Sequence, residues 1–266
     1  MAKIGVFDSG VGGLTVLREL ASHFPGEDFI YLGDTARLPY GTKSPDTIRA
    51  YSEQVLNFLV DRKVDALVIA CNTASSQVAE KEWMGIPVFN VIEPGAEQAF
   101  KTSENKKIGV LGTRATIASQ AYSLAIQKLS ENAEVYSQSC PLFVPLAEEG
   151  LWEDPITNLI TYRYVQPLLL YQIDTLILGC THYPLLKSAI QKAAGNSVQL
   201  VDSGKAIAEQ LELIFQSGKL SRTGKDKGEM HILATDLSVH TQTLAEQILK
   251  PLEIHQFEVV HIEPKR

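Results

Sequence analysis

Short apolar runs alternate along this chain with longer runs in which apolar residues recur every three or four positions. The short runs are rich in β-branched residues and have the length of strands, whereas the longer runs have the period of amphipathic helices. Strands are predicted at residues 3–7, 28–32, 66–70, 87–90, 107–111, 134–137, 175–178, 198–201, 230–234 and 258–261. Helices are predicted at residues 14–22, 45–61, 75–83, 120–129, 155–171, 185–194, 206–217 and 241–249. This alternation is typical of an α/β fold with a mainly parallel sheet.

Composition and charge narrow the class of protein. With 266 residues, of which 45% are apolar, the chain can bury the core of one large domain or two ordinary ones. The net charge of −7 argues against nucleic-acid binding, because phosphate contacts need an excess of Lys and Arg. A local pocket for a small anion stays possible.

The cellular location is also predicted from composition. No basic segment followed by an apolar stretch precedes the first strand, so we expect no secretory signal, and no apolar run approaches 18 residues, so we expect no membrane span. Three cysteines, odd in number and far apart, do not form a disulfide framework and fit a reducing compartment. We therefore predict a cytoplasmic protein.

Two cysteines occupy matching places. Cys71 closes the apolar run that starts at Ala66 and precedes Asn-Thr, and Cys180 closes the run that starts at Thr175 and precedes Thr-His. Open α/β sheets bind ligands where strands end and helices start. A thiol at a helix N-terminus has a lowered pKa and supplies thiolate near neutral pH. Two such thiols facing one substrate suit moving a proton on and off a carbon.

The two cysteines belong to an internal duplication. The segment Ile4-Gly-Val-Phe-Asp-Ser-Gly10 resembles Ile108-Gly-Val-Leu-Gly-Thr-Arg114, and the interval from this element to the cysteine is 67 residues in one half and 72 in the other. Short strands of any α/β protein look alike, but two pairs at nearly equal spacing favour duplication. Two related halves facing each other would place both cysteines at one interface, where pockets commonly form.

Other interpretations of the cysteines are weighed against this one. Either cysteine alone is more often a buried structural residue at the end of a strand. Cys180 and His182 are both metal-ligand types, but no CxxC or further Cys/His pair completes a site, and we predict no metal. Cys140 has no polar neighbours in the sequence and is predicted to lie in the core.

Three loops add polar candidates. Asp8–Gly13 has neither the GxGxxG nor the P-loop pattern, so it is either a structural turn or a backbone cradle for a carboxylate or phosphate. The loop Gly33–Gly41 combines a rigid backbone, a side-chain hydroxyl and unhindered backbone amides. Its Asp34, taken alone, is an ordinary turn residue. A third loop ends in Glu148-Glu149 before a glycine, a pattern that is usually solvated.

At these residues the chain resembles the glutamate racemases of the cofactor-independent aspartate/glutamate racemase superfamily. The motifs occur in the order of the family across residues 4 to 204, with Val201-Asp-Ser203 as a weaker last match. They are Phe7-Asp-Ser-Gly-Val-Gly-Gly13, Gly33-Asp34 with Leu38-Pro-Tyr-Gly41, Ala70-Cys-Asn-Thr-Ala74, Phe143-Val-Pro and Gly179-Cys-Thr-His-Tyr-Pro184. The cysteine motifs alone would indicate only the superfamily, and the Asp-Ser-Gly-Val-Gly-Gly and Pro-Tyr-Gly segments narrow it to glutamate.

The resemblance implies a reaction and roles. L- and D-glutamate would interconvert by removal of the α-proton on one face and return of a proton on the other, with one cysteine as thiolate base and the other as thiol acid. By family analogy Cys71 would take the proton from D-glutamate and Cys180 from L-glutamate. Asp8 would assist Cys71, His182 would assist Cys180, and Asp34 matches a carboxylate that supports the first cysteine.

The resemblance also implies a binding site. A family glutamate matches Glu148 or Glu149, and the spacing from Val144-Pro145 favours Glu148. The positions that match substrate-binding residues of the family are Asp8, Ser9, Pro39, Tyr40, Gly41, Asn72, Thr73, Thr113, Thr181 and His182.

We therefore predict two α/β domains of similar plan, residues 1–94 plus 207–266 and residues 95–206, with glutamate at their interface. The resemblance implies no pyridoxal phosphate and no metal, a homodimer, and a product used in bacterial peptidoglycan. The alternatives are an aspartate or hydantoin racemase of the same superfamily and a non-catalytic anion-binding protein on the same fold.

Overall fold

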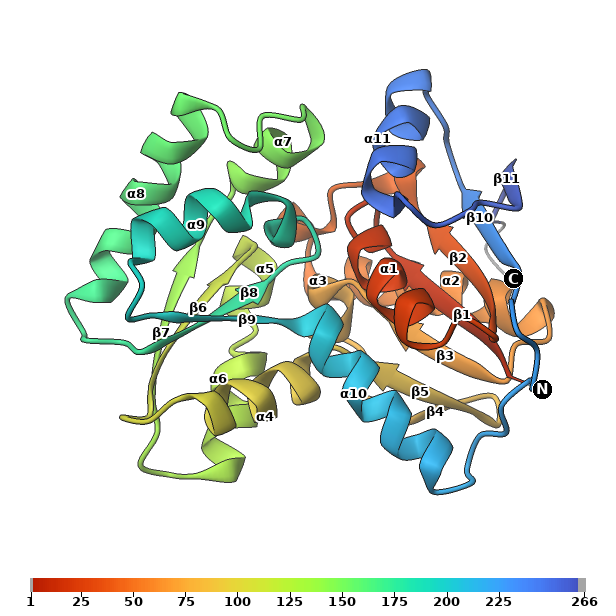
Figure 1. Cartoon of the computed structure of the whole chain (residues 1–266), viewed down its shortest axis with the longest axis horizontal. Helices are drawn as coiled ribbons and strands as arrows, with labels where there is room; N and C mark the ends of the chain where they lie inside the picture. Colours follow the sequence, from red (N-terminus) through yellow and green to blue (C-terminus); the bar gives the residue numbers. More distant parts are fainter. Residues whose placement is uncertain (1, 263–266) are drawn as a thin grey trace.

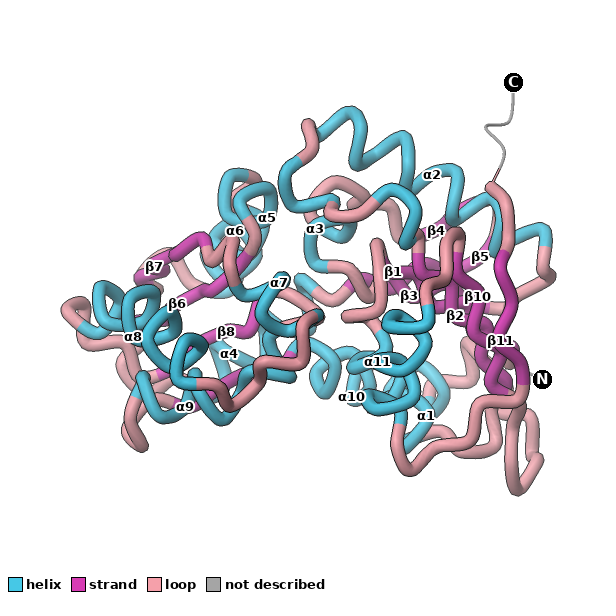
Figure 2. Tube along the Cα trace, turned by 90° about the horizontal axis from the view of Figure 1, so that it is seen from above, coloured by secondary structure: helices cyan, strands magenta, loops and turns pink. Residues whose placement is uncertain are grey.

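A computed structural model describes residues 2–262 and contains two β-sheets that lie side by side with helices on both faces of each (Figure 1). Viewed from above, the two sheets form two lobes, and most helices lie on the outside (Figure 2). The sheet of the first lobe has seven strands in the order β11-β10-β2-β1-β3-β5-β4, and that of the second has four in the order β7-β6-β8-β9. All neighbouring strands are parallel except β4 and β5, so the predicted α/β class is confirmed.

Most predicted elements are found within one or two residues. The strands are β1 Lys3–Asp8, β2 Asp28–Gly33, β3 Ala66–Ile69, β4 Glu82–Trp83, β5 Ile86–Asn90, β6 Lys107–Gly112, β7 Glu134–Ser139, β8 Thr175–Gly179, β9 Gln199–Asp202, β10 Met230–Ala234 and β11 Gln256–Val259. The α-helices are α1 Leu14–His23, α2 Pro45–Asp61, α3 Asn72–Ser75, α4 Ile92–Thr102, α5 Arg114–Ala118, α6 Ala121–Leu129, α7 Phe143–Glu148, α8 Pro155–Leu169, α9 Lys187–Ala194, α10 Ser203–Gln216 and α11 Val239–Leu249.

The first lobe is built from two separate parts of the chain. After the second lobe the chain returns through α10, and β10 then pairs with β2 in parallel, followed by β11 at the edge. The domain limits predicted at 94/95 and 206/207 fall inside α4 and α10, which lie next to each other between the lobes (Figure 1). The exact limits stay a prediction.

Each sheet is covered on both faces by apolar side chains from its helices. In the first lobe α1, α10 and α11 pack on one face and α2 on the other. In the second lobe α7, α8 and α9 cover one face, and α4 and α6 cover the other. Because both faces are buried, the central strands are continuous apolar runs, which is why they stand out in the sequence.

The two sheets have corresponding strand order and register. β1 lies between β2 and β3, as β6 lies between β7 and β8. Ile4 is opposite Ala66, and Ile108 is opposite Thr175. Cys71 follows Ala66 by five residues and Cys180 follows Thr175 by five residues, so the two thiols occupy equivalent places at the carboxyl ends of equivalent strands. This correspondence supports the predicted duplication.

The helix predicted at 75–83 is wrong. Helix α3 ends at Ser75, and Glu82–Trp83 instead form a short antiparallel strand against β5. The connecting residues Met84 and Gly85 both have positive φ, 49° and 84°, the geometry of a two-residue hairpin turn that a helix cannot contain. Pairing with the edge of β5 therefore outweighs the helical pattern of this segment.

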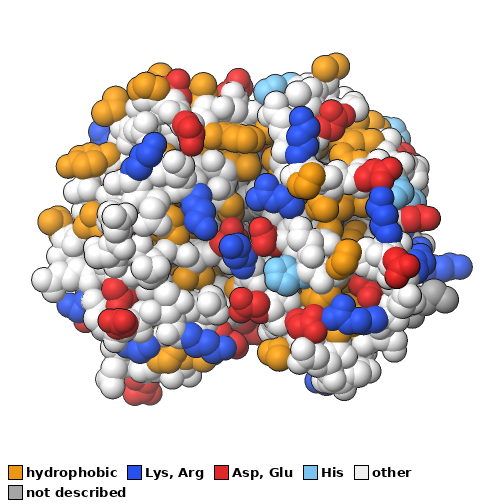
Figure 3. All heavy atoms as spheres, in the orientation of Figure 1, with side chains coloured by type: hydrophobic (Ala, Val, Ile, Leu, Met, Phe, Trp, Pro, Cys, Tyr) orange, Lys and Arg blue, Asp and Glu red, His pale blue; other side chains and the backbone are white. Residues whose placement is uncertain are grey.

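The sequence pattern did not predict the short helices α3 and α5, and it also missed α4 and α7. In α4 the Pro94-Gly95 pair is typical of a turn, but Pro94 lies in the first turn, where its missing N–H costs nothing. Helices α4 and α7 flank the region where the lobes meet (Figure 1). On the face seen in Figure 3, charged side chains of both signs gather along the seam between the lobes.

Candidate active site

One cavity of about 530 Å³ contains both thiols. It lies between the lobes, at the carboxyl ends of the central strands of both sheets. Of the residues predicted for the site, it is lined by Ser9, Pro39, Tyr40, Gly41, Cys71, Asn72, Thr73, Thr113, Glu148, Cys180, Thr181 and His182. Glu149 also lines it. The structure thus brings together residues that lie more than 170 positions apart.

Cys71 is buried at the start of α3. Its Sγ accepts a hydrogen bond from the backbone N–H of Ala74 at 3.4 Å and lies 3.5 Å from Oγ of Ser9. Burial, and then the negative charge of Asp8, raise the pKa of the Cys71 thiol to about 12. The expectation of a lowered pKa is therefore wrong for this cysteine, because the loss of hydration outweighs the helix N-terminus.

Cys180 has a different environment. Its Sγ lies 3.8 Å from Nδ1 of His182, and Nε2 of the same ring lies 3.0 Å from Oε1 of Glu148. Burial by itself would lower the pKa of His182, but its hydrogen bonds to Cys180 and Glu148 outweigh burial and raise the pKa to about 10. The imidazole thus carries a proton at neutral pH and links the thiol to a carboxylate. Of the two adjacent acids, Glu148 makes this contact.

Asp8 lies behind the cavity, fully buried. Its carboxylate accepts hydrogen bonds from the backbone N–H of Gly10 at 2.9 Å and from the hydroxyl of Thr181 at 3.2 Å. Burial raises the pKa of Asp8, and the positive charge of His182 opposes that effect. No hydrogen bond joins Asp8 to Cys71 among the residues described, so its carboxylate acts on that thiol through charge, and its assisting role stays a prediction.

Asp34 also lies outside the cavity wall. Its carboxylate accepts hydrogen bonds from Nε of Arg37 at 2.7 Å, from the hydroxyl of Tyr40 at 2.5 Å and from the hydroxyl of Thr235 at 3.0 Å. Burial and the charge of Asp34 raise the pKa of Tyr40. The carboxylate therefore holds the Pro39–Gly41 segment of the wall, and its support of Cys71 stays a prediction.

Each lobe supports the cysteine loop of the other. A Cβ placed on Gly12 in the first lobe would lie 2.4 Å from Nδ1 of His182 in the second, so only glycine leaves room for the imidazole. In the opposite direction, Oγ1 of Thr113 in the second lobe is 2.9 Å from Oγ1 of Thr73, two residues after Cys71. The glycine-rich loop thus packs closely against the opposite lobe, and an anion-binding role for its backbone stays a prediction.

Sequence reasoning missed several residues of the site. Arg114 lines the cavity, and Tyr122 donates a hydrogen bond to Oδ1 of Asn72 at 2.6 Å. Cys140 is fully buried, as predicted, but it also lines the cavity. No motif marks Tyr122, because its partner lies 50 residues away on the other lobe.

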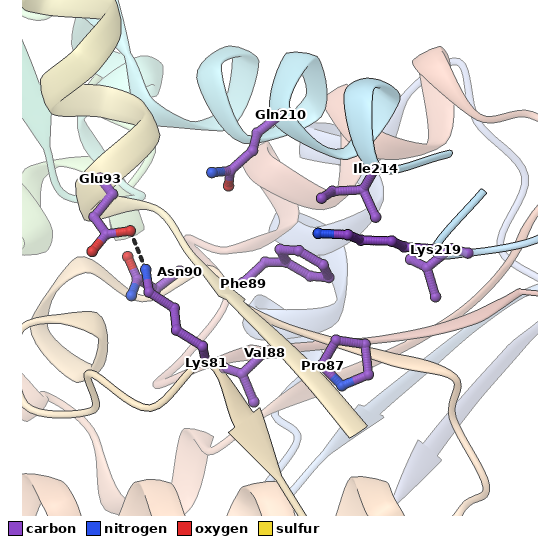
Figure 4. A pocket seen from close by; sticks show the side chains of 10 residues that line it. Lys81, Pro87, Val88, Phe89, Asn90, Glu93, Gln210, Ile214 and Lys219 are labelled. Carbon is purple, nitrogen blue, oxygen red and sulfur yellow. Dashed lines mark hydrogen bonds and ion pairs between the residues drawn. The ribbon is translucent and has the colours of Figure 1, made fainter. Parts of the chain in front are cut away.

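A second cavity of about 300 Å³ lies beside β5, α4 and α10 (Figure 4). It is lined by Phe89 and Ile214 and carries the ion pair between Lys81 and Glu93. No cysteine lines it, so the two-thiol chemistry belongs to the larger cavity.

Within residues 2–262 the structure offers neither a metal site nor a membrane-spanning helix. Within this part of the chain no group of three or more His, Cys, Asp or Glu side chains is arranged to hold a metal ion. None of the helices described is both long and apolar enough to cross a bilayer.

Comparison with known proteins agrees with this geometry. The model of the Asp/Glu/hydantoin racemase family matches residues 4–211. A glutamate racemase from Aquifex pyrophilus is 50% identical over 252 residues, which cover 93% of this chain and 94% of that protein.

Solved structures are similar over almost the whole chain. The crystal structure of glutamate racemase isoform RacE1 from Bacillus anthracis has a TM-score of 0.94 at 36% identity and covers 100% of this chain and 99% of its own. The glutamate racemase from Francisella tularensis, solved in complex with D-glutamate, has a TM-score of 0.90 at 38% identity and covers 99% of both chains. The resemblance found in the motifs and the prediction of an isomerase are confirmed, and the chain belongs to the Asp/Glu/hydantoin racemase family.

Proposed function

We propose that this chain interconverts L- and D-glutamate by proton transfer between Cα and two cysteines. The observation that supports this most is the single cavity lined by both thiols at equivalent strand ends. A volume of about 530 Å³ is ample for one amino acid. The name of the Francisella structure, a complex with D-glutamate, identifies the ligand of a relative and supports the choice of substrate.

In the L to D direction the Cys180 thiolate takes the α-proton, so that the Cα–H bond breaks and an S–H bond forms. The electron pair stays on Cα until the Cys71 thiol gives its proton to the opposite face. The reverse direction exchanges the roles. Two groups on opposite faces remove the need to turn the substrate within the site.

The environments of the two thiols fit these roles. The raised pKa of Cys71 keeps it protonated and ready to act as the acid in the L to D direction. Beside Cys180, the His182 imidazole lies 3.8 Å from the sulfur and has a raised pKa, so it places a positive charge next to the group that takes the proton from L-glutamate. For the D to L direction, the ammonium group of the bound amino acid places a positive charge in the cavity, which lowers the pKa of Cys71 toward the value that a base needs.

The developing carbanion needs a preorganised pocket, because the α-proton is far less acidic than any side chain. The hydroxyl groups of Ser9, Thr73, Thr113 and Thr181 line the cavity and can donate to the substrate carboxylates. The amide of Asn72 lines it as well.

Deuterium incorporation tests this function. Purified protein is incubated with L-glutamate in deuterium oxide without added cofactor, and Cα deuteration and D-glutamate are followed by NMR and chiral chromatography. We expect D-glutamate deuterated at Cα, no turnover of L-aspartate, and loss of racemisation in Cys71→Ala but not in Cys140→Ala. Racemisation by Cys71→Ala at the wild-type rate would exclude the two-thiol mechanism, and turnover of aspartate alone would assign the chain to another branch of the family.

The supply of D-glutamate for peptidoglycan and a homodimer, both implied by the family resemblance, stay predictions, as does the cytoplasmic location expected from composition.

A further inference from the structure

Tyr122 connects the two cysteine loops across the lobes. It lies on α6 in the second lobe and is only 2% exposed. A Cβ placed on Gly179, the residue before Cys180, would lie 3.2 Å from Cε2 of the ring, and a Cβ on Gly95 would lie 3.3 Å from its hydroxyl oxygen. These two glycines leave the space in which the ring is held beside the second thiol loop.

The hydroxyl group of Tyr122 reaches the loop of the first thiol. It donates a hydrogen bond of 2.6 Å to Oδ1 of Asn72, the residue after Cys71. Because a phenol has one proton, this bond commits the hydroxyl hydrogen of Tyr122 to the carbonyl oxygen of the Asn72 amide.

This arrangement fixes the orientation of the Asn72 amide. With Oδ1 engaged by Tyr122, the NH₂ group is left without a hydrogen-bond partner among the described residues, although it is buried. An unpaired buried donor costs about 1–3 kcal/mol, so such a group in a native protein needs an explanation, and a bound partner or a catalytic role is one. Asn72 lines the substrate cavity, where a carboxylate offers the acceptor that the amide lacks.

We propose that Tyr122 is a positioning residue that orients the Asn72 amide so that its NH₂ group donates to a carboxylate of the substrate. This inference rests on the proposed function only for the identity of the ligand. Without the tyrosine hydroxyl the amide is free to turn and present its carbonyl oxygen, which repels a carboxylate.

A double-mutant cycle tests the proposal. The variants are Tyr122→Phe, Asn72→Ala and the double variant, with Tyr136→Phe as matched control, because it removes the same atom from a tyrosine of the same lobe whose hydroxyl donates to Glu134. Binding is measured by calorimetric titration with racemic glutamate. Two enantiomers have equal enthalpy, so their interconversion produces no heat and the titration reports binding alone. The kcat and KM of racemisation are measured in parallel.

We expect Tyr122→Phe to weaken glutamate binding and raise KM about tenfold, equivalent to about 1.4 kcal/mol, with a smaller change in kcat. In the Asn72→Ala background the same substitution should change binding less than twofold, because the group on which it acts is gone. Tyr136→Phe should bind as the wild type does.

Two outcomes would overturn the inference: unchanged binding in Tyr122→Phe, or an equal loss with and without Asn72, which would indicate general loosening of the lobes. The failure of the proposed function is separate, since it would show as glutamate binding without racemisation by the wild type, and the binding cycle would still decide the role of Tyr122.

Discussion

The two halves of the molecule share a backbone plan and differ in the chemistry they place on it. Asp34 follows β2 and Cys140 follows β7, and each donates its backbone N–H to the carbonyl that ends the central strand, at 3.0 Å to Asp8 and 2.8 Å to Gly112. One position thus holds a buried carboxylate in the first half and a buried thiol in the second. Duplication supplies equivalent positions, and side chains make the halves unequal.

The same contrast applies to the cysteines. Sγ of Cys71 accepts a hydrogen bond from a backbone N–H of α3, and the negative charge of Asp8 raises its pKa. Sγ of Cys180 instead lies beside the His182 imidazole, which in turn contacts the Glu148 carboxylate. Mirror-image substrates need a base on each face, but the two bases need not be activated in the same way. The structure therefore surrounds the two thiols with different polar groups although their places in the fold are equivalent.

The largest effect should come from removing either thiol. Cys71→Ala and Cys180→Ala should each reduce racemisation about 10³-fold, since acid–base groups contribute roughly 10²–10⁴. The remaining thiol keeps one half-reaction, so in deuterium oxide Cys71→Ala should exchange the α-proton of L-glutamate and Cys180→Ala that of D-glutamate, both without inversion. Exchange of the opposite enantiomers, followed by NMR, would reverse the assignment of faces.

Glu148→Gln should have the next largest effect. The carboxylate helps raise the pKa of His182 to about 10, so the neutral amide should lower that pKa. The imidazole stays protonated until the pH exceeds its pKa, so the wild type should lose activity only at alkaline pH. In Glu148→Gln the same loss should begin at a lower pH. At pH 8 the kcat/KM of the variant should therefore be about tenfold below that of the wild type.

The adjacent acid offers the matched control for that change. Glu149 lines the cavity, but among the described residues it is Glu148 that bonds to His182, so the pH profile of Glu149→Gln should follow the wild type within twofold. Equal shifts in both variants, measured as kcat/KM from pH 6 to 10, would remove the special role of Glu148.

Asp8→Asn should change the two thiols unequally. Removing the negative charge lowers the pKa of Cys71, so its alkylation by iodoacetamide at pH 9 should accelerate roughly fivefold, the effect of somewhat less than one pKa unit. Alkylation of Cys180 should change less, as followed by mass spectrometry of each peptide. Asp65→Asn, at the opposite end of the same sheet, is the control, and slower alkylation of Cys71 in Asp8→Asn would contradict the argument.

The smallest effect concerns stability. Asp34→Asn weakens hydrogen bonds to Arg37, Tyr40 and Thr235, and should lower the free energy of unfolding by about 2 kcal/mol, because hydrogen bonds to charged groups contribute about 1.5–3 kcal/mol each. Cys140→Ala should cost about 1 kcal/mol, the loss of one small buried group. Urea unfolding of both variants measures the two losses in the free energy of unfolding. Equal losses would contradict the prediction that the carboxylate position contributes more to stability than the thiol position.

Much of the site could be predicted from residues that are close in sequence. The runs ending in Cys71 and Cys180 are buried strands of parallel sheets, so their apolar character and their polar endings are visible in the chain. The helix predicted at 45–61 is found to the residue, and in the structure Ser44 caps its start and Pro45 lies in its first turn. The wrong helix at 75–83 and the missed α4 lie where pairing with a sheet edge and packing between the lobes override local preference.

The sequence alone determined which side chains stand at the ends of which strands, because strand and helix patterns depend on neighbours a few positions apart. Only the tertiary structure decided that both thiols enter one cavity, that Glu148 rather than Glu149 contacts His182, and that Tyr122 holds Asn72. It also decided the proton affinities, raising that of Cys71 against the local expectation. Hydration and charge at a buried atom depend on residues brought together from both lobes, and no local pattern records them.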